Sequence, residues 1–207
     1  MSAHPNHLLI MARHPALGQG KTRLASTIGA EATLAVYHEL LAHAGAAVAG
    51  VAATKTVWLA GTPTPGAPDY WPGYAQHPQP SGDLGQRMHT AFAAAFAAGA
   101  AKAVIIGTDC PELTTDLLTG AFAHLDTHDV VLGPALDGGY YLLGMNHLIP
   151  DFFLQKAWST DSVRPATLAD AARLGLRVAL LPPLADVDTA EDLAAWRTRV
   201  ATAEQLS

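Results

Sequence analysis

The sequence contains one cysteine, Cys110, among its 207 residues. A single thiol cannot build an internal disulfide framework, and this composition favours a reducing compartment, so we expect a cytoplasmic protein. The chain also lacks any apolar run of about 18 residues, the length that a membrane-spanning helix needs. Residues 1–7 carry no lysine or arginine ahead of the first apolar segment, which argues against a signal peptide.

Charged residues are also scarce: they make up 14% of the chain, and the formal net charge is −6. This acidic balance argues against a nucleic-acid partner, because proteins of that class carry a basic surface for the phosphate backbone. Half of the residues are hydrophobic, and a chain of 207 residues fits within one core. We therefore expect a single domain that spans residues 1–207.

Short apolar segments alternate with segments of helical periodicity, which predicts an α/β fold with a mostly parallel sheet. Strands are expected at 8–12, 56–60, 103–109, 129–133, 140–144 and 178–181. Helices are expected from Thr22 or Glu31 to Val48, from Asp83 to Ala98, from Thr114 to Leu125, from Ser159 or Thr160 to Leu174, and from Asp188 to Val200. The segment 61–82 is rich in proline and glycine, and loops of this length tend to be functional.

One carboxylate, Asp109, ends an expected strand that is rich in β-branched apolar residues, and it precedes Pro111 by two positions. In open α/β sheets, ligands bind beyond the carboxyl ends of the parallel strands, which is where a metal-bridged phosphate would lie. Asp109 is therefore a candidate metal ligand. Capping of the next helix would explain the same carboxylate in purely structural terms.

The loop after the first strand gathers three of the chain's twelve basic residues, Arg13, Lys21 and Arg23. Gly18 and Gly20 would let backbone N–H groups approach an anion closely, and the start of the following helix favours negative charge. Arginine offers phosphate a bidentate fork, and lysine offers a mobile point charge. No acidic residue nearby in the sequence can neutralise these cations. The loop is predicted to bind phosphate, and a solvated basic loop is the alternative.

Gly20-Lys21-Thr22 resembles the end of a Walker A loop, so a P-loop kinase is a rival hypothesis. The pattern G-x-x-x-x-G-K-[ST] requires glycine at the position that Pro15 occupies. Proline lacks the N–H group, and its ring would crowd the phosphate. This mismatch disfavours the P-loop interpretation.

A second acidic segment, 186–192, follows the last predicted strand. Asp188 and Glu191 have the spacing of a capping box, which is a structural role. Asp186 and Asp188 alternate on an extended segment, however, and one cap needs only one carboxylate. Mg²⁺ bound to phosphates takes one or two protein carboxylates, which Asp109 and Asp188 would provide. Asp188 is thus a candidate metal ligand or a helix cap, and Asp186 is the alternative ligand.

Two further segments are candidate walls of the site. Asp137-Gly138-Gly139-Tyr140-Tyr141 indicates a turn between two strands, and its glycines would also let a sugar or an acceptor lie close to the backbone. Asp83 is predicted to cap the helix after the long loop, and Arg87 follows one turn later, where it could reach a phosphate.

Five motifs carry a resemblance that spans Leu8 to Leu193. They are Lys21-Thr22-Arg23-Leu24, Gly82-Asp83-Leu84-Gly85-Gln86-Arg87-Met88, Gly107-Thr108-Asp109-Cys110-Pro111, Asp137-Gly138-Gly139-Tyr140-Tyr141 and Asp186-Val187-Asp188-Thr189-Ala190-Glu191-Asp192. With these motifs the chain resembles the glycosyltransferase-like proteins of unknown function named radical-SAM/selenodomain-associated transferases, within the nucleotide-diphospho-sugar transferase (GT-A) superfamily. It is also similar to 2-phospholactate guanylyltransferase and molybdenum-cofactor guanylyltransferase.

The resemblance implies a GT-A-like (Rossmann-like) three-layer sandwich with a mostly parallel mixed sheet. It also implies that the basic loop holds a triphosphate, that Asp109 and Asp188 hold Mg²⁺ or Mn²⁺, and that residues 79–85 form the wall beside the nucleobase. Together, the residue patterns and the resemblance make Arg13, Gly18, Gly20, Lys21, Arg23, Gln79, Gly82, Asp83 and Arg87 the candidate nucleotide-binding residues, and Asp137, Gly138, Gly139 and Tyr140 the candidate substrate-binding residues.

The function that we expect is nucleotidyl transfer from an NTP to a small phosphorylated acceptor, with release of pyrophosphate and with Lys21, Arg13 and Asp109 as catalytic residues. Glycosyl transfer from an NDP-sugar is the alternative, although Pro111 interrupts the Asp-x-Asp motif that is usual in GT-A sugar transferases. A nucleotide-binding protein without turnover is a third interpretation. The sequence leaves open the base, the acceptor and the formation of a homodimer. If the site exists, Lys21 and Asp109 must lie close together on the same side of the sheet.

Overall fold

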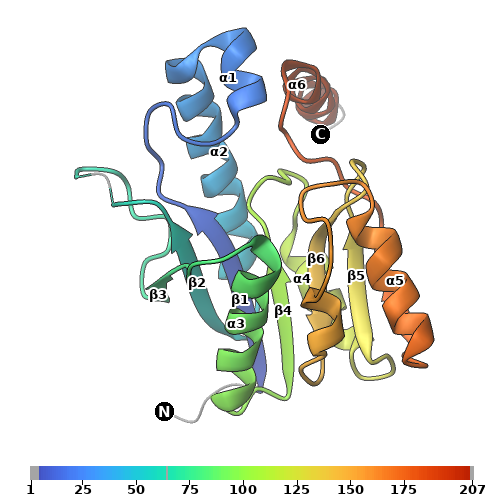
Figure 1. Cartoon of the computed structure of the whole chain (residues 1–207). Coiled ribbons are helices and arrows are strands. Elements are labelled where there is room, and N and C mark those ends of the chain that lie inside the picture. The colour runs from blue at the N-terminus through green and yellow to red at the C-terminus, as the bar shows by residue number, and fades with distance from the viewer. Residues whose placement is uncertain (1–4, 64, 206–207) are drawn as a thin grey trace.

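The computed structural model describes residues 5–63 and 65–205 of the chain (Figure 1). The part of the chain that it describes contains a seven-stranded sheet in the order β3-β2-β1-β4-β6-β5-β7. The strands are β1 (Asn6–Arg13), β2 (Thr54–Ala60), β3 (Ala75–Pro78), β4 (Lys102–Ile106), β5 (Val130–Pro134), β6 (Tyr140–Met145) and β7 (Val178–Leu180). Neighbouring strands are parallel except for β6, which runs antiparallel to β4 and β5. The predicted α/β fold with a mixed, mostly parallel sheet is confirmed.

Helices cover both faces of the sheet and complete three layers (Figure 1). They are α1 (Thr22–Ile28), α2 (Ala30–Ala49), α3 (Leu84–Ala97), α4 (Thr115–His124), α5 (Val163–Arg173) and α6 (Ala190–Gln205), with a 3-10 turn, η1, at Pro150–Phe153. Successive side chains of a strand point to opposite faces. Leu8 and Ile10 of β1 therefore pack with α2 and α4, whereas Leu9 packs with α3, η1 and α5.

The central place of β4 explains its uninterrupted apolar sequence. Ala103, Val104, Ile105 and Ile106 are all buried, because helices cover both faces of the sheet at this strand. A polar side chain at any of these positions would lose its contacts with water.

The helix expected to end at Val48 is in fact two helices. Gly29 adopts φ +85° between α1 and α2, and this left-handed residue interrupts the chain of helical backbone angles. Both of the starting points that the sequence suggested, Thr22 and Glu31, therefore lie near real helix starts.

The helix expected from Ser159 or Thr160 begins later, at Val163. Ser159 adopts φ +64°, which a right-handed helix does not accommodate, so the predicted start is wrong by three to four residues. The end of this helix is as predicted: Gly175, with φ +68°, follows the C-cap residue Leu174.

The carboxyl ends of β1 and β4 meet at one edge of the sheet. Ile10 of β1 pairs in register with Ile106, the last residue of β4. The basic loop follows β1 directly, and Asp109 follows β4 by three residues. Helices α1 and α6 contact each other beyond the same edge (Figure 1). In the described part of the chain, no helix has the length and apolar character needed to cross a bilayer.

Candidate functional site

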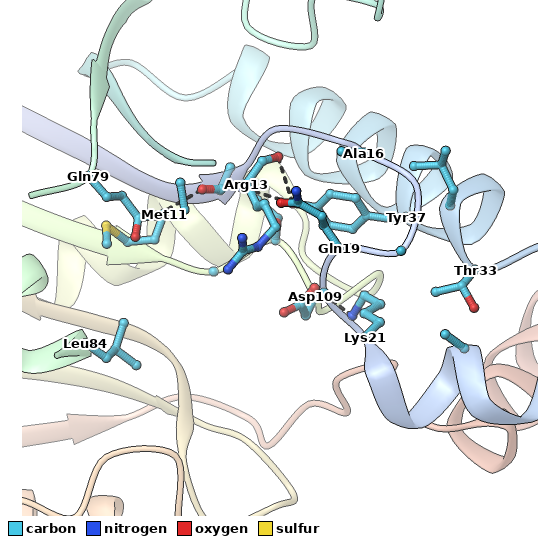
Figure 2. Close-up of a pocket in the computed structure, with 18 of the residues that line it drawn as sticks. Met11, Arg13, Ala16, Gln19, Lys21, Thr33, Tyr37, Gln79, Leu84 and Asp109 are labelled. Atoms are coloured by element: carbon cyan, nitrogen blue, oxygen red, sulfur yellow. Dashed lines mark hydrogen bonds and ion pairs between the residues drawn. The ribbon is translucent and has the colours of Figure 1, made fainter. Parts of the chain in front are cut away.

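A cavity of about 450 Å³ opens at the carboxyl ends of β1 and β4 (Figure 2). Its wall combines the basic loop, part of α2, the start of α3 and the residues after β4. The predicted site residues that line it are Arg13, Gly18, Gly20, Lys21, Gln79, Arg87 and Asp109. The parallel topology brings these distant segments together, because the ends of neighbouring parallel strands share one edge.

The ammonium of Lys21 lies between the two acidic segments. Its Nζ atom is 2.7 Å from Oδ1 of Asp109 and 3.3 Å from Oδ1 of Asp188, and it donates to the carbonyl oxygen of Val187 at 2.7 Å. An ammonium has three N–H donors, so these three acceptors use all of them. The Lys21 side chain is 7% exposed, against 46% for Asp109 and 34% for Asp188. Lys21 is thus the inner member of a charged cluster whose carboxylates reach solvent.

The backbone of the loop aims Lys21 at this cluster. Gly18 and Gly20 adopt φ values of 72° and 76°, and Lys21 itself lies in the left-handed region with φ 44° and ψ 44°. A left-handed conformation is uncommon for a residue with a side chain and persists only where its surroundings hold it. The three contacts of the Lys21 ammonium are such a restraint.

Asp188 forms ion pairs with basic side chains instead of capping α6. Its Oδ2 atom is 2.8 Å from Nη2 of Arg23, while its Oδ1 atom faces Lys21. The predicted capping box of Asp188 and Glu191 is wrong, since Thr189 and Asp192 form the box one residue later. The N–H of Thr189 donates to Oδ2 of Asp192 at 2.8 Å, and the N–H of Asp192 donates to Oγ1 of Thr189 at 3.2 Å.

Asp109 is not a helix cap either. Thr114 caps α4, and its Oγ1 atom accepts a hydrogen bond from the N–H of Leu117 at 3.2 Å. Both carboxylates that the sequence left between a structural role and a binding role therefore direct an oxygen toward the same ammonium.

Arg13 points into the cavity, and within the described residues it forms no ion pair with a carboxylate (Figure 2). Tyr37 fixes the backbone of Arg13: the N–H of Arg13 donates to the Tyr37 hydroxyl at 3.0 Å, and the hydroxyl donates to the carbonyl oxygen of Arg13 at 3.0 Å. Burial raises the pKa of Tyr37 to about 12, so the hydroxyl keeps its proton and this hydrogen bond. Arg13 is thus a positioned cation with an open guanidinium.

Gln79 and Arg87 form another part of the wall. The side-chain amide of Gln79 donates to the carbonyl oxygens of Ala12 at 2.9 Å and Trp58 at 3.1 Å, and its Oε1 atom accepts from Nη1 of Arg87 at 3.3 Å. Gln79 therefore shapes the cavity without a free N–H donor. Arg87 also donates from Nε to the carbonyl oxygen of Gly82 at 2.9 Å, which leaves part of its guanidinium available to a ligand.

The predicted cap by Asp83 is confirmed. Its Oδ1 atom accepts from the N–H of Gln86 at 2.8 Å, and the Gln86 side chain accepts from the N–H of Asp83 at 3.0 Å. Gly82 and Asp83 stand at the start of α3 but are not among the residues that line the cavity. The capping box occupies the Asp83 carboxylate.

Asp186 contacts Cys110 rather than a cation. The Cys110 thiol donates to Oδ1 of Asp186 at 2.8 Å. Burial, together with the negative charge of Asp109, Asp137 and Asp188, raises the pKa of the Asp186 carboxyl to about 6. Burial and the nearby Asp186 also raise the pKa of the Cys110 thiol, which makes a reactive thiolate unfavourable. Negative charge therefore gathers at this edge, although the described part of the chain holds no group of three His, Cys, Asp or Glu side chains arranged for a metal ion.

The turn between β5 and β6 is not part of the cavity wall. Oδ1 of Asp137 accepts from the N–H of Gly139 at 2.9 Å. Gly138 has φ +95°, and a Cβ atom there would lie 2.6 Å from Cα of Asp161. Tyr140 packs into the core that contains α3 and α5. A hydrogen bond within the turn accounts for Asp137 and Gly139, and close packing accounts for Gly138 and Tyr140. Substrate binding by these four residues stays a prediction.

Sequence reasoning misses several residues of the cavity wall, among them Gln19, Thr33 and Tyr37. Another is Ser159. Its left-handed backbone follows Trp158, whose indole packs on Gly85 so closely that a Cβ atom there would lie 2.4 Å from the ring. Gly85 belongs to the motif at 82–88, and a glycine there was the only hint in the sequence that another segment packs closely against the start of α3. That signal does not identify the partner, because Trp158 is far away in the sequence.

The family model described as "Uncharacterized protein conserved in bacteria (DUF2064)" matches residues 32–160. A crystal structure from Desulfovibrio desulfuricans G20, which carries the provisional description nucleotide-diphospho-sugar transferase, is 30% identical with a TM-score of 0.84. The match covers 91% of this chain and 84% of that chain. No functionally curated protein matches the chain.

More distant structures share the fold. The inositol-1-phosphate CTP transferase from T. maritima is 13% identical over 92% of both chains, with a TM-score of 0.56. Rv0371c from Mycobacterium tuberculosis H37Rv, solved as a complex with manganese, is 15% identical over 92% of this chain and 96% of that chain, with a TM-score of 0.55. These likenesses concern the fold alone. The 30% identical structure, described as a nucleotide-diphospho-sugar transferase, agrees with the fold that the resemblance implies.

Proposed function

The chain belongs to the family of uncharacterized proteins conserved in bacteria (DUF2064), and from that premise we propose that it is a metal-dependent transferase acting on a nucleotide. In the leading form of the proposal, an oxygen of a small phosphorylated acceptor attacks the α-phosphorus of an NTP, and pyrophosphate leaves. The 30% identical relative described as a nucleotide-diphospho-sugar transferase supports a nucleotide substrate. The shared fold of a CTP transferase is consistent with it.

The observation that carries the proposal is an open arginine beside an acidic cluster at one cavity. Arg13 points into the cavity, while Asp109 lines it and, with Asp188, surrounds the Lys21 ammonium. A triphosphate with its divalent cation needs both kinds of group: cationic side chains for the phosphate oxygens and carboxylates for the metal. The cavity of about 450 Å³ lies within the usual range for small-molecule sites, about 300–1,000 Å³.

Asp109 and Asp188 fit a divalent cation. Carboxylate oxygens are the hard ligands that Mg²⁺ and Mn²⁺ prefer, and the Lys21 ammonium stands in for such a cation within 3.3 Å of an oxygen of each residue. Mg²⁺ commonly takes one or two protein carboxylates and completes its shell with phosphate oxygens and water. When bound, the ion would supply positive charge to the phosphates. The manganese complex of Rv0371c, a protein of the same fold, is consistent with a divalent cation.

The protein's own groups would bind and orient the reactants. Arg13 offers a bidentate fork to phosphate oxygens, and the free donors of Arg87 lie on the same cavity wall. Gly18 and Gly20 let a phosphate approach the backbone. Arg23, whose side chain is exposed and pairs with Asp188, would support the leaving pyrophosphate. No protein nucleophile is needed, because positioning and charge stabilisation suffice for this chemistry.

Glycosyl transfer from an NDP-sugar is the second candidate, and the description of the 30% identical relative favours it. This reaction would use the same two carboxylates and would place the sugar toward the turn at 137–140. We rank it second because Pro111 stands where the second aspartate of an Asp-x-Asp motif would be. A nucleotide-binding protein without turnover is the candidate from a different class.

A panel of NTPs and NDP-sugars, each with and without Mg²⁺, tests the proposal by thermal shift. The best ligand then enters two assays, one for pyrophosphate release with phosphorylated acceptors and one for NDP release. Pyrophosphate release that depends on the acceptor supports nucleotidyl transfer, and NDP release supports glycosyl transfer. Metal-dependent binding with neither product indicates the non-catalytic candidate, and no binding of any nucleotide rejects all three.

A further inference from the structure

The contacts of Lys21 conflict with a direct role in holding phosphate. All three of its N–H donors already have acceptors, on Asp109, Val187 and Asp188, and the side chain is 7% exposed. A phosphate oxygen would find no free donor on this ammonium. A divalent cation meets a similar obstacle, because the ammonium occupies the position beside the Oδ1 atoms of both carboxylates.

We propose that Lys21 is the resident cation of the Asp109–Asp188 pair, and that nucleotide binding exchanges it for the divalent cation. In the exchange, the two carboxylates pass to the incoming ion, and the Lys21 ammonium turns to the nucleotide phosphates. This inference rests on the proposed function, since it assigns the order in which that site fills. The free protein then binds the divalent cation weakly, and nucleotide and ion bind tightly only together.

The local charge balance favours exchange over simple addition. Lys21 and Arg23 already neutralise the two carboxylates, with contacts of 2.7 to 3.3 Å. A dication that entered alone would lie against the ammonium, and like charges at contact distance repel. A triphosphate brings the negative charge that lets both cations remain. The flexible four-carbon stem of lysine allows its ammonium to swing from the carboxylates to the nucleotide phosphates.

Arg23 provides a matched control. It contacts the same carboxylate as Lys21, through Oδ2 of Asp188 at 2.8 Å, and carries the same charge. Its side chain is 69% exposed, so it can move into solvent when another cation arrives. Lys21→Met and Arg23→Met therefore remove equal charge from one cluster, but only the first empties the position between the carboxylates.

The experiment measures Mn²⁺ binding to the metal-free full chain by electron paramagnetic resonance, without nucleotide. Lys21→Met should bind Mn²⁺ about tenfold or more tightly than the wild type, which corresponds to about 1.4 kcal/mol. Lys21→Arg retains a cation and should stay near the wild type, and Arg23→Met should change the affinity by less than about threefold, since exposed ion pairs are weak. Adding Asp109→Asn to Lys21→Met should abolish the gain.

Equal or weaker Mn²⁺ binding by a folded Lys21→Met protein would overturn the exchange and leave Lys21 as a purely structural contact. Circular dichroism establishes folding, and Lys21→Gln gives the same comparison if the methionine variant does not fold. The proposed function fails separately, if no nucleotide binds the wild type in the thermal-shift panel. In that case a Mn²⁺ gain in Lys21→Met would still show that the ammonium holds the metal position.

Discussion

Two parts of the site, named here the paired side and the open side, handle positive charge differently. On the paired side, the carboxylates of Asp109 and Asp188 hold Lys21 and Arg23 in ion pairs. On the open side, within the described residues, Arg13 and Arg87 form no ion pair with a carboxylate, and Arg87 donates only to neutral oxygens. Three of these four cations come from one short segment, residues 13–23, yet they differ in what they can offer a ligand. The comparison teaches that a cation near a cavity is available only when the fold leaves its donors unused.

Breaking the paired side at Asp109 should have the largest effect. Asp109→Asn keeps the shape of the side chain but removes the charge that would hold the divalent cation, so turnover should fall by about 10²-fold or more. Asp116→Asn, in the exposed first turn of α4, is the control that should leave the rate unchanged. Pyrophosphate release measures both variants. An unaltered rate in Asp109→Asn would remove this residue from the metal site.

The pKa of the Asp186 carboxyl reflects the negative charge that gathers near the paired side. The pKa of its carboxyl is raised from 3.8 to about 6 in the folded protein, first by burial and then by its acidic neighbours. The folded state therefore holds this proton more tightly than the unfolded chain does. The stability that this proton contributes is present below the unfolded pKa of 3.8 and is lost as the pH rises through about 6.

Asp186→Asn keeps the acceptor for Cys110 and removes this titration. Relative to the variant, the wild type should lose about 3 kcal/mol of unfolding free energy across that pH window, at about 1.4 kcal/mol per pKa unit. Urea unfolding of both proteins, from about pH 4 to pH 7.5 and with a metal chelator present, measures this difference in unfolding free energy. If the wild type instead became more stable relative to the variant as the pH rises, the predicted direction of the pKa shift would be wrong.

The open side is tested through Arg13. Arg13→Met should weaken binding of the preferred nucleotide by about tenfold, because hydrogen bonds to charged groups contribute about 1.5–3 kcal/mol and some would be replaced by water. Arg13→Lys keeps the positive charge but loses the bidentate guanidinium, so its nucleotide affinity should lie between those of the wild type and Arg13→Met. Arg177→Met, which removes an exposed cation paired with Asp129, is the matched control. Isothermal titration calorimetry that shows equal affinities for the Arg13 and Arg177 variants would place the nucleotide elsewhere.

Arg23 should show the smallest effect. Its side chain is 69% exposed, so its pair with Asp188 is screened by water, and Arg23→Gln should change the unfolding free energy by less than about 1 kcal/mol. Urea unfolding at low and high salt measures this change, and the difference between wild type and variant should shrink as salt rises. A larger loss that salt does not reduce would mean that the paired side depends on Arg23 for its structure.

The sequence by itself determined the framework on which this comparison rests. Apolar runs predicted the central strands, the Asp83 capping box predicted the start of α3, and the turn at 137–139 predicted that β5 and β6 are neighbours. It also predicted that the basic loop and Asp109 share one edge of the sheet, since both follow parallel strands. These features are local, because burial periodicity and capping depend on residues a few positions apart.

Only the tertiary structure decided which charges are paired. Lys21 meets Asp188 across 167 positions, and no local pattern encodes that contact. The capping box at α6 shows the same limit: Asp188 with Glu191 and Thr189 with Asp192 both fit the spacing, and the structure selects the second. Ser159 enters the cavity through a left-handed backbone that its sequence does not demand. The physical reason is that ion pairing depends on distance in space, which the assembled sheet sets and the order of residues does not.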